Sequence, residues 1–509
     1  MPPARPDILL IVLDTLRRDR LASYGHDRPT APAFDAFAAD STLFTQAVAP
    51  AQWTIPAHAS LFTGLYPGAH GVTQAHHKLS GLHPTLAETL RAAGYHTAGF
   101  SSNPLVGVLD NDLTRGFAEF FAYAGAAINR PLDAAGPLRQ RWQRFARPTQ
   151  NRFAHSDALF RASMNPLLVP LWTRFVNYKG RTAQSVTDLI AYLERRGAAG
   201  SAAPLFSFLN LMGAHLPYRP PQAALAAVAP GLCRDARAAR FVRRFNAQAA
   251  RWASPADPPL ADWQRAALCA HYDAEIRAQD AHLGRLLGYL RASGALDHTL
   301  VIILADHGEG HGDHGYVGHS FVVYQELVHV PLLVRWPGGA GRGERVTAPV
   351  STRRVYHTAL EAADAAALLD AADPNADTGG LSLARAGGAD GGAAFAEAYP
   401  PVTLLRLLER RAPHLIARLR LRETRRAVYA AGWKLVTVGA DVEGLFETGA
   451  DPADAHNLAA ARPEQVADLQ SRLDAFTAAL AARANGDGPL PAQADAAITA
   501  SLRALGYIE

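Results

Sequence analysis

Short, nearly continuous apolar stretches recur along the chain and are separated by segments with helical periodicity. The apolar stretches cover residues 8–13, 97–100, 205–211, 300–304 and 331–334. Continuous rather than alternating hydrophobicity is typical of a parallel strand that is buried on both faces. The helical patterns cover residues 84–93, 183–196 and 268–293. We therefore predict an α/β fold with a mostly parallel central sheet and helices on both of its faces.

Three regions interrupt this alternation and indicate the domain organisation. Residues 120–180 contain arginines interleaved with aromatic residues, and residues 220–262 are rich in alanine, proline and arginine. We interpret both as insertions. Residues 364–394, rich in alanine, glycine and aspartate, are typical of a surface connection into a C-terminal unit.

The C-terminal unit has its own pattern of elements. Residues 426–435 alternate like a β-hairpin, and residues 463–482 predict a final helix. We expect a catalytic domain over residues 1–370 and a smaller α+β subdomain with an antiparallel sheet over residues 371–509.

Composition and charge exclude several classes of protein. Hydrophobic residues make up 49% of the 509 residues and charged residues 19%, which is typical of a globular protein rather than a disordered one. The net charge of +4 is too small to predict nucleic-acid binding. The two cysteines, Cys233 and Cys269, form no CxxC motif, so any bound metal must be held by oxygen and nitrogen.

No apolar stretch approaches the roughly 20 residues that a membrane-spanning helix requires. We see no signal peptide either, so we expect a cytoplasmic protein. The arginines and aromatic residues over about residues 138–172 could contact an anionic membrane surface or nucleic acid. We favour a helical cap over the site, with peripheral membrane contact as the alternative, and we expect no nucleic-acid partner.

An acidic residue stands directly after the first apolar stretch, where Asp14 precedes Thr15. In an open parallel sheet, ligands bind at the carboxyl ends of the strands, so a carboxylate at this place would face the binding crevice. We interpret Asp14 as a candidate metal ligand. The alternative is that it caps a helix over residues 15–19, since aspartate is favoured at helix N-caps.

Residues 52–71 combine a hydroxyl side chain with a predicted helix start. Thr54 and Pro56 precede a helix that we expect to begin near Ala57, which places the Thr54 hydroxyl at the positive end of the helix dipole. A hydroxyl there can be deprotonated with the help of a metal and attack an anionic ester. The alternative role as a simple N-cap does not explain the ordered string of residues that continues to His70.

The densest cluster of reactive side chains follows the apolar stretch 300–304. Adjacent Asp306 and His307 offer one oxygen and one nitrogen ligand to a divalent cation. The histidines that follow can contact substrate oxygens or transfer protons, namely His311, His314 and His319. A purely structural role is disfavoured, because so many polar residues are costly to bury.

These three motifs, in this order, resemble the sulfatase family within the alkaline phosphatase superfamily. Further similar segments are residues 210–218, 272–280, 324–332, 433–435, 445–446 and 451–458. The resemblance spans almost the whole chain apart from the two insertions. It implies an alkaline-phosphatase-like α/β fold and a hydrolase that acts on ester bonds.

The resemblance also implies roles for individual residues. One divalent metal, either Zn, Mn, Mg or Ca, would be bound by Asp14, Asp306 and His307. Thr54 would be the nucleophile and would touch the same metal. His215 and His319 fall where the family places residues that contact the substrate's anionic or leaving group. We also expect His58 to take part in catalysis and three further side chains to bind substrate, namely Asn103, His311 and His70.

Departures from the family pattern bear on the chemistry. Sulfatases carry Cys or Ser in a Cys/Ser-x-Pro-x-Arg motif, where it is oxidised to formylglycine, whereas this chain has Thr54 and His58 in those places. Threonine cannot form that aldehyde, because its β-carbon bears a methyl group. Thr15 stands where the family usually has a second carboxylate. The sequence Ser101-Ser102-Asn103 stands where the family usually has Lys-x-His. We therefore expect no formylglycine.

A threonine nucleophile is what phosphodiesterases, phosphonate hydrolases and phosphoethanolamine transferases of this superfamily use. We therefore expect hydrolysis of a phosphate diester, phosphate monoester or phosphonate ester through a covalent intermediate on Thr54. The substrate would be a small-molecule, glycan or lipid anionic ester. Alternatives are a sulfuric ester hydrolase that works without formylglycine, a phospho-headgroup transferase and an inactive binding homologue.

Overall fold

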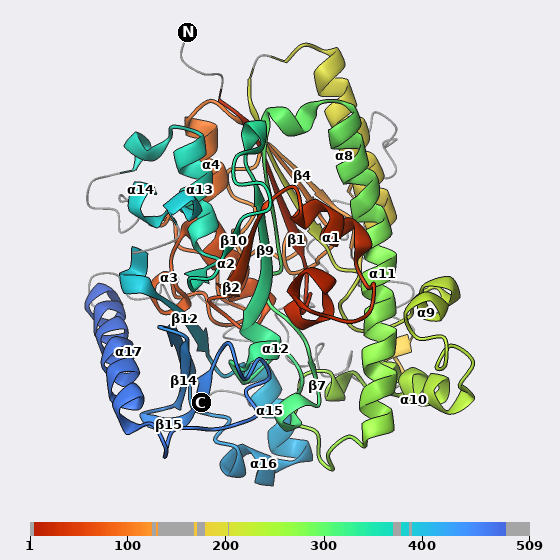
Figure 1. The fold of residues 1–509 in the computed structure, drawn as a ribbon, viewed down its shortest axis with the longest axis vertical. Coiled ribbons are helices and arrows are strands. Elements are labelled where there is room, and N and C mark those ends of the chain that lie inside the picture. The colour runs from red at the N-terminus through yellow and green to blue at the C-terminus, as the bar shows by residue number, and fades with distance from the viewer. Residues whose placement is uncertain are drawn as a thin grey trace, which may run out of the picture.

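The computed structural model describes residues 5–124, 129–130, 167–170, 179–201, 203–369, 378–385 and 389–484. A central sheet runs through this part of the chain (Figure 1). Its parallel strands are, in spatial order, β6 (Thr299–Leu304), β1 (Asp7–Leu13), β5 (Leu205–Leu211), β3 (His96–Ser101) and β4 (Glu119–Ala122). All residues of β5 and β6 are buried. The predicted parallel core of an α/β fold is confirmed.

One strand of the sheet, β9 (His329–Arg335), differs from the prediction in its direction. It contains the stretch 331–334, but it pairs antiparallel with β6 and with β2 (Thr42–Val48). Every residue of β9 is buried, so its hydrophobicity is as continuous as that of a parallel strand and cannot reveal its direction. The short strands β10 (Arg345–Val346) and β11 (Val350–Ser351) pair parallel with β2 and complete a nine-stranded sheet in the described residues.

Helices cover both faces of this sheet, as the sequence predicts. In Figure 1, α8 (Thr182–Ala198) and the long α11 (Asp262–Ala292) lie together on one side. α4 (Leu86–Ala92) and α13 (Arg354–Ala362) pack together on the other. The apolar residues of α11 recur at helical spacing on its buried face, for example at Leu283, Leu286, Leu287 and Leu290.

A second, antiparallel sheet lies near the C-terminus. It consists of β12 (Ala393–Ala398), β13 (Arg425–Ala430), β14 (Trp433–Val438) and β15 (Asp441–Glu447). The predicted hairpin is the pair β13 and β14, and the predicted last helix is α17 (Pro463–Ala484), which packs against both strands. The separate antiparallel sheet is confirmed, and the domain boundary at residue 370 stays a prediction.

The two insertions differ in how much of them the structure describes. Residues 220–262 form α9 (Gln222–Val228) and α10 (Ala236–Ala247), which pack against α11. Most of residues 120–180, including nearly all of the segment for which we favour a helical cap and consider membrane contact as the alternative, lies outside the described residues.

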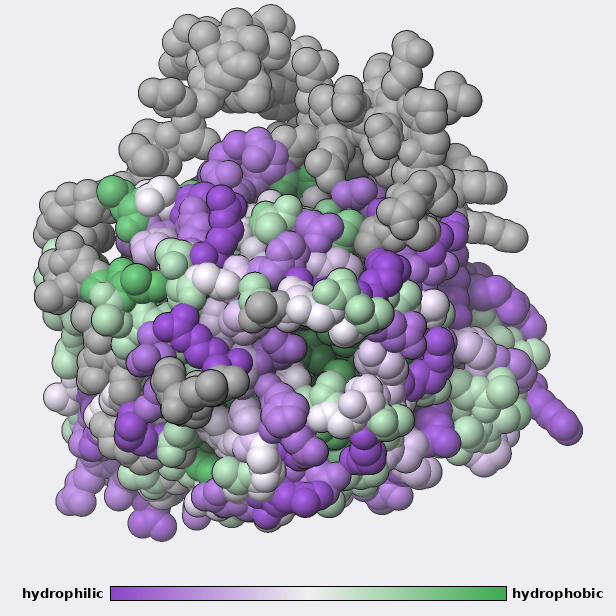
Figure 2. Space-filling model, turned by 90° about the horizontal axis from the view of Figure 1, so that it is seen from above, coloured by the Kyte–Doolittle hydropathy of each residue, from purple (hydrophilic) through white to green (hydrophobic). Residues whose placement is uncertain are grey.

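The surface shows the mixture expected for contact with water. Figure 2 shows hydrophilic and hydrophobic residues interspersed over the described part of one face. Among the described helices, none combines the length and the apolar character that crossing a membrane requires.

Candidate functional site

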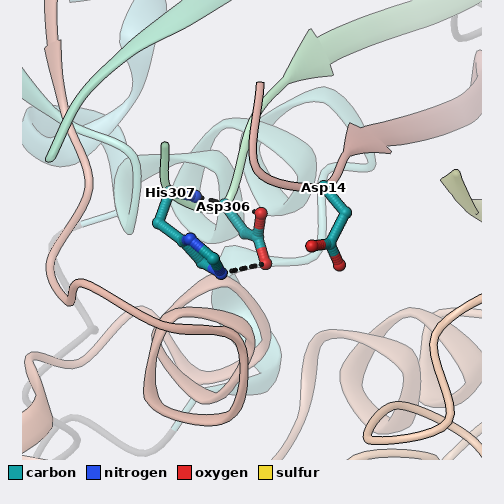
Figure 3. Close-up of side chains that lie close together, drawn as sticks. All are labelled: Asp14, Asp306 and His307. Carbon is teal, nitrogen blue, oxygen red and sulfur yellow. Dashed lines mark hydrogen bonds and ion pairs between the residues drawn. The ribbon is translucent and has the colours of Figure 1, made fainter. Parts of the chain in front are cut away.

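Two neighbouring strands of the central sheet end in carboxylates. Asp14 follows β1 and Asp306 follows β6 with one residue between, and the two strands pair in parallel with Val12 opposite Leu304. Their carboxylates and the imidazole of His307 point into one space (Figure 3). One ligand atom from each residue lies within 4.8 Å of the others, and all three residues are buried. The parallel register therefore brings together groups that are almost 300 residues apart in the chain.

The Asp14 carboxylate is held from one side only. Its Oδ2 accepts hydrogen bonds from the side-chain amides of Asn103 at 2.6 Å and Asn210 at 3.3 Å. Its Oδ1 is buried and has no hydrogen-bond partner among the described residues. Burial raises the pKa of Asp14 to about 6, although the two amides oppose this shift. Asp14 also caps no helix, because the turn that follows, at residues 18–20, has Arg17 at its N-cap.

The Asp306 carboxylate shows the same asymmetry. Its Oδ1 accepts hydrogen bonds from the backbone N–H groups of Thr15 at 3.2 Å and His307 at 3.0 Å. Thr15 has a φ of 59°, a left-handed conformation that a β-branched residue rarely adopts. Asp306 Oδ2 is buried without a hydrogen-bond partner among the described residues. Burial, and then the nearby Asp14, raises the pKa of Asp306 well above its usual range.

The tautomer of His307 is set by the backbone. Its Nδ1 lies 2.9 Å from the carbonyl oxygen of Gly308, which can only accept, so Nδ1 carries the proton. Nε2 is then the unprotonated nitrogen, which lies 3.4 Å from Asp306 Oδ2. Burial lowers the pKa of His307 well below its usual range, which keeps the ring neutral.

The ligand atoms of Asp14, Asp306 and His307 fit a divalent cation. Two buried carboxylate oxygens without hydrogen-bond partners and one unprotonated imidazole nitrogen are left to share a single space. Two carboxylates at such short range repel each other, and a cation between them would remove the repulsion. Oxygen and nitrogen ligands suit several divalent metals, so the donor set does not select one ion.

Thr54 lies beside this group. It is the first residue of α2 (Thr54–Thr63), and its hydroxyl oxygen is 3.3 Å from Nε2 of His307. The prediction that the helix begins near Ala57 was wrong, because the cap is Trp53 and Thr54 already belongs to the first turn. Thr54 is only 2% exposed, and it lies at the positive end of the helix dipole as expected.

His58 lies one helical turn after Thr54 and is close to Asp306. Its Nδ1 is 2.9 Å from the carbonyl oxygen of Thr54 and 3.5 Å from Asp306 Oδ2. Its Nε2 lies 3.3 Å from the side-chain amide nitrogen of Asn210, which also donates to Asp14. Burial lowers the pKa of His58 to about 4, so this histidine is neutral near neutral pH. It therefore brings no positive charge to the place where sulfatases carry an arginine.

Two further predicted histidines face each other next to His307. The ring centroid of His319 is 4.6 Å from that of His307 and 5.2 Å from that of His215. His319 Nδ1 is 2.8 Å from Oε1 of the fully buried Glu309. Burial lowers the pKa of His319, but the charge and the hydrogen bond of Glu309 together with the charge of Asp14 raise it by more, so the net pKa is above its usual value.

His215 has a different environment from His319. Its Nδ1 lies 2.6 Å from the carbonyl oxygen of Leu216, which places the proton on Nδ1. Burial, and then the charge of His319, lowers the pKa of His215 well below its usual range. The two facing histidines thus differ in protonation. The protonated, positively charged ring is favoured at His319, and the neutral ring is favoured at His215.

Of the three predicted substrate-binding residues, only Asn103 contacts the group of Asp14, Asp306 and His307. His70 bonds Ser60 Oγ through Nε2 at 3.1 Å and the backbone N–H of Val72 through Nδ1 at 3.1 Å. His311 contacts Arg17 and Tyr218 instead. The substrate contacts expected of His70 and His311 stay predictions.

The structure also adds two residues to the site. Asn210, at the end of β5, links Asp14 to His58, and Glu309 holds His319. Their positions carried a signal, because Asn210 is a polar residue near the end of a buried strand and Glu309 lies inside the histidine-rich motif. Nothing in the sequence pattern showed which histidine Glu309 would contact.

Comparisons with known proteins relate the whole chain to a family and to solved structures. A family model described as sulfatase matches residues 6–365. The chain is 25% identical over 486 residues to an ulvan-active sulfatase of Formosa agariphila, covering 93% of this chain and 80% of that relative. It is 28% identical over 401 residues to steryl-sulfatase of Mus musculus, covering 71% and 62% respectively. A phosphonate monoester hydrolase of Agrobacterium radiobacter has a similar structure, with a TM-score of 0.60 at 23% identity and coverage of 94% and 96%.

Proposed function

The chain belongs to the sulfatase family and is an ester hydrolase, and from this premise we propose that Thr54 is its nucleophile. The substrate we propose is a phosphate diester, a phosphate monoester or a phosphonate ester. The reaction would pass through a covalent intermediate on the Thr54 oxygen.

One observation carries this proposal. The Thr54 hydroxyl oxygen lies 3.3 Å from Nε2 of His307, next to two carboxylate oxygens without hydrogen-bond partners in the described residues. This position of the hydroxyl supports a metal-assisted attack by Thr54. A threonine cannot supply the aldehyde that the family's usual mechanism needs, so its own oxygen is the group left to react.

We propose that Asp14, Asp306 and His307 hold one divalent metal. A bound divalent ion would polarise the ester and lower the pKa of a nearby hydroxyl. The residues meet the requirements for such a site, since each offers a buried ligand atom and His307 has its other nitrogen fixed by Gly308.

The attack step follows from the positions of the side chains. Thr54 would first release its hydroxyl proton to solvent, and its ionised oxygen would then form a bond to phosphorus while the bond from phosphorus to the leaving oxygen breaks. His319 would donate its Nε2 proton to that oxygen, since its Nδ1 is held by the Glu309 carboxylate.

The second step releases the group from Thr54. Water would attack phosphorus and give one proton to His319, while the bond from phosphorus to the Thr54 oxygen breaks and restores the ionised Thr54. His215, whose Nε2 is the unprotonated nitrogen, would accept a hydrogen bond from the attacking water. The two histidines thus have complementary roles on one side of the reacting group.

Sulfate ester hydrolysis without formylglycine is the second candidate. It is favoured by the names of the two curated relatives given above, which are sulfatases. Threonine as nucleophile and a neutral His58 in place of the arginine favour the phosphorus esters instead.

A single assay series separates the candidates. One purified, metal-loaded preparation would be tested on the 4-nitrophenyl esters of sulfate, phosphate, ethyl phosphate and phenylphosphonate. We expect turnover of one or more phosphorus esters, and loss of that turnover in Thr54→Ala. Exclusive turnover of the sulfate ester would favour the second candidate, and undiminished turnover by Thr54→Ala would contradict the proposed nucleophile.

A further inference from the structure

We propose that His311 and Tyr218 are positioning residues of the active site. Their hydrogen bond joins the segment that leads to His319 to the loop that carries His215. The inference rests on the proposed function, because it assigns the two residues to the alignment of the histidines that serve the reaction. It gives His311 a role other than substrate contact.

The contacts of Arg17 with His311 and of His311 with Tyr218 form a bridge between the loops, and Arg17 is one end of this bridge. Its side chain is 5% exposed and follows Asp14 by three positions. Nη1 of Arg17 donates to the carbonyl oxygen of Glu309 at 3.0 Å and to Asp313 Oδ2 at 2.8 Å, and it lies 3.3 Å from Nδ1 of His311. One guanidinium nitrogen therefore ties the backbone of Glu309 and the ring of His311 to the loop after β1.

The centre of the bridge is the His311 ring, whose tautomer follows from its neighbours. Nη1 of Arg17 carries two hydrogens and shares them among Glu309, Asp313 and His311. A protonated Nδ1 would point its hydrogen at this donor, so Nδ1 of His311 is the unprotonated nitrogen. Nε2 then carries the proton and donates it to the hydroxyl oxygen of Tyr218 at 2.7 Å. Both side chains are buried, with 1% of His311 and 2% of Tyr218 exposed. The ring is thus held from both sides in one orientation.

The other end of the bridge is Tyr218, in the loop that carries His215. Its backbone N–H donates to Asn246 Oδ1 at 3.0 Å, and its carbonyl oxygen accepts from Asn246 Nδ2 at 2.7 Å. Asn246 belongs to α10, so the second insertion holds the backbone of this loop by two hydrogen bonds. Tyr218 is consequently fixed at its backbone by Asn246 and at its hydroxyl by His311.

The bridge reaches both facing histidines. Arg17 holds the carbonyl of Glu309, whose carboxylate holds His319. Through His311 it also holds Tyr218, which follows His215 by three positions. A well-packed apolar pair could fill the same space, but it would lack the directional bonds that fix how the two loops meet. The distance of 5.2 Å between the rings of His215 and His319 is therefore set by this bridge.

Removal of one atom tests the inference. Tyr218→Phe deletes only the hydroxyl that His311 contacts and leaves both Asn246 bonds, which are made to the backbone, intact. We expect the turnover number kcat of the metal-loaded enzyme to fall about a hundredfold, the loss that a misplacement of about 1 Å can cause, with little change in KM. His311→Gln, which keeps a nitrogen donor, should retain more activity than His311→Leu.

A double-mutant cycle with His215 distinguishes positioning from general packing. If Tyr218 acts through His215, Tyr218→Phe should reduce kcat by less than about twofold in a His215→Asn background. An equal fold loss in both backgrounds would overturn the proposal. The matched control is Tyr95→Phe, which removes a hydroxyl bonded at 2.9 Å to the carbonyl oxygen of Pro6, outside the active site, and should reduce kcat equally little in both backgrounds.

A second measurement needs no substrate. In protein with isotope-labelled histidine, Tyr218→Phe should shift the ring resonances of His215 and His311, while Tyr95→Phe should leave them in place. Wild-type protein that hydrolyses none of the tested esters would count against the proposed function alone. Unchanged His215 resonances in Tyr218→Phe would overturn the bridge, whatever the substrate proves to be.

Discussion

The hydroxyl oxygen of Thr54 lies 3.3 Å from Nε2 of His307, although 253 residues separate the two in the chain. The contact joins the first turn of α2 to the segment that follows β6. His307 directs this nitrogen toward Thr54 because its other nitrogen is bonded to the Gly308 carbonyl. A hydroxyl and a set of metal-ligand candidates are thus held in one buried space, and this arrangement is the basis of the proposed chemistry.

Replacing the nucleophile should remove catalysis without unfolding the protein. We expect Thr54→Ala to lower kcat by at least about a thousandfold, while Thr54→Ser should keep measurable turnover because it keeps the hydroxyl. The assay is steady-state hydrolysis of the best 4-nitrophenyl ester. Thr63→Ala is the matched control, since Thr63 is a buried threonine of the same helix and lies at its far end. Comparable activity of Thr54→Ala and Thr63→Ala would refute the assignment.

Removing a ligand candidate should abolish metal binding. We expect Asp306→Asn to be purified with much less than one bound divalent ion per chain and to be inactive, because one of the two facing carboxylates is lost. Elemental analysis of the dialysed protein measures this. Asp280→Asn is the control, since Asp280 is a buried carboxylate held by the backbone N–H groups of Ala33 and Phe34. Equal metal content in the two variants would count against the site.

The pair of Glu309 and His319 should matter most for poor leaving groups. A positioned general acid typically contributes about a hundred- to ten-thousandfold, but 4-nitrophenol leaves readily as an anion and needs little help. We therefore expect His319→Ala to reduce hydrolysis of a phenyl ester far more than that of the 4-nitrophenyl ester. Glu309→Gln should show the same trend with a smaller loss, because an amide can still accept from Nδ1. A uniform loss across the series would argue against proton donation by His319.

The two acidic ligand candidates predict a pH effect on stability. Burial raises the pKa of Asp14 from 3.8 to about 6, and the pKa of Asp306 is raised well above its usual value. A carboxyl with a higher pKa in the folded state takes up protons on folding. In the metal-free protein these two carboxyls should therefore contribute a loss of stability as the pH rises from about 4 to about 6, and further as Asp306 ionises, whereas buried histidines with a lowered pKa, such as His58, contribute a gain over the same range.

A bound cation should reverse this loss, because it stabilises both carboxylates. Added divalent metal should then raise the melting temperature more near about pH 7 than near about pH 5. Thermal unfolding with a chelator and with metal, at a series of pH values, measures the effect. A stabilisation that is the same at every pH would contradict the involvement of these carboxylates.

Several features of the fold follow directly from the sequence pattern. The buried parallel strands and the long helices could be predicted because their hydrophobic periodicity depends only on local spacing. The direction of β9 could not, since a strand that is buried on both faces has the same pattern whether it is parallel or antiparallel. The start of α2 was placed too late, because Pro56 is equally compatible with the first turn of the helix.

The site could be predicted only in part for a similar reason. Asp14, Asp306 and His307 follow strands of a parallel sheet, so their convergence can be expected from position alone. The pairing of His319 with Glu309 and of His311 with Tyr218 depends on how loops fold back on themselves. Such contacts leave no periodic signal, which is why His311 could not be assigned from the sequence to a bridge between loops.

The stereochemical course of hydrolysis decides whether Thr54 forms a covalent intermediate. A P-chiral phosphorothioate diester with a 4-nitrophenyl leaving group would be hydrolysed in ¹⁸O-labelled water, and the configuration of the product determined by ³¹P NMR. Two successive in-line displacements, the first by Thr54 and the second by water, each invert phosphorus, so we predict net retention. Net inversion would show that water attacks the ester directly and would contradict the covalent role of Thr54.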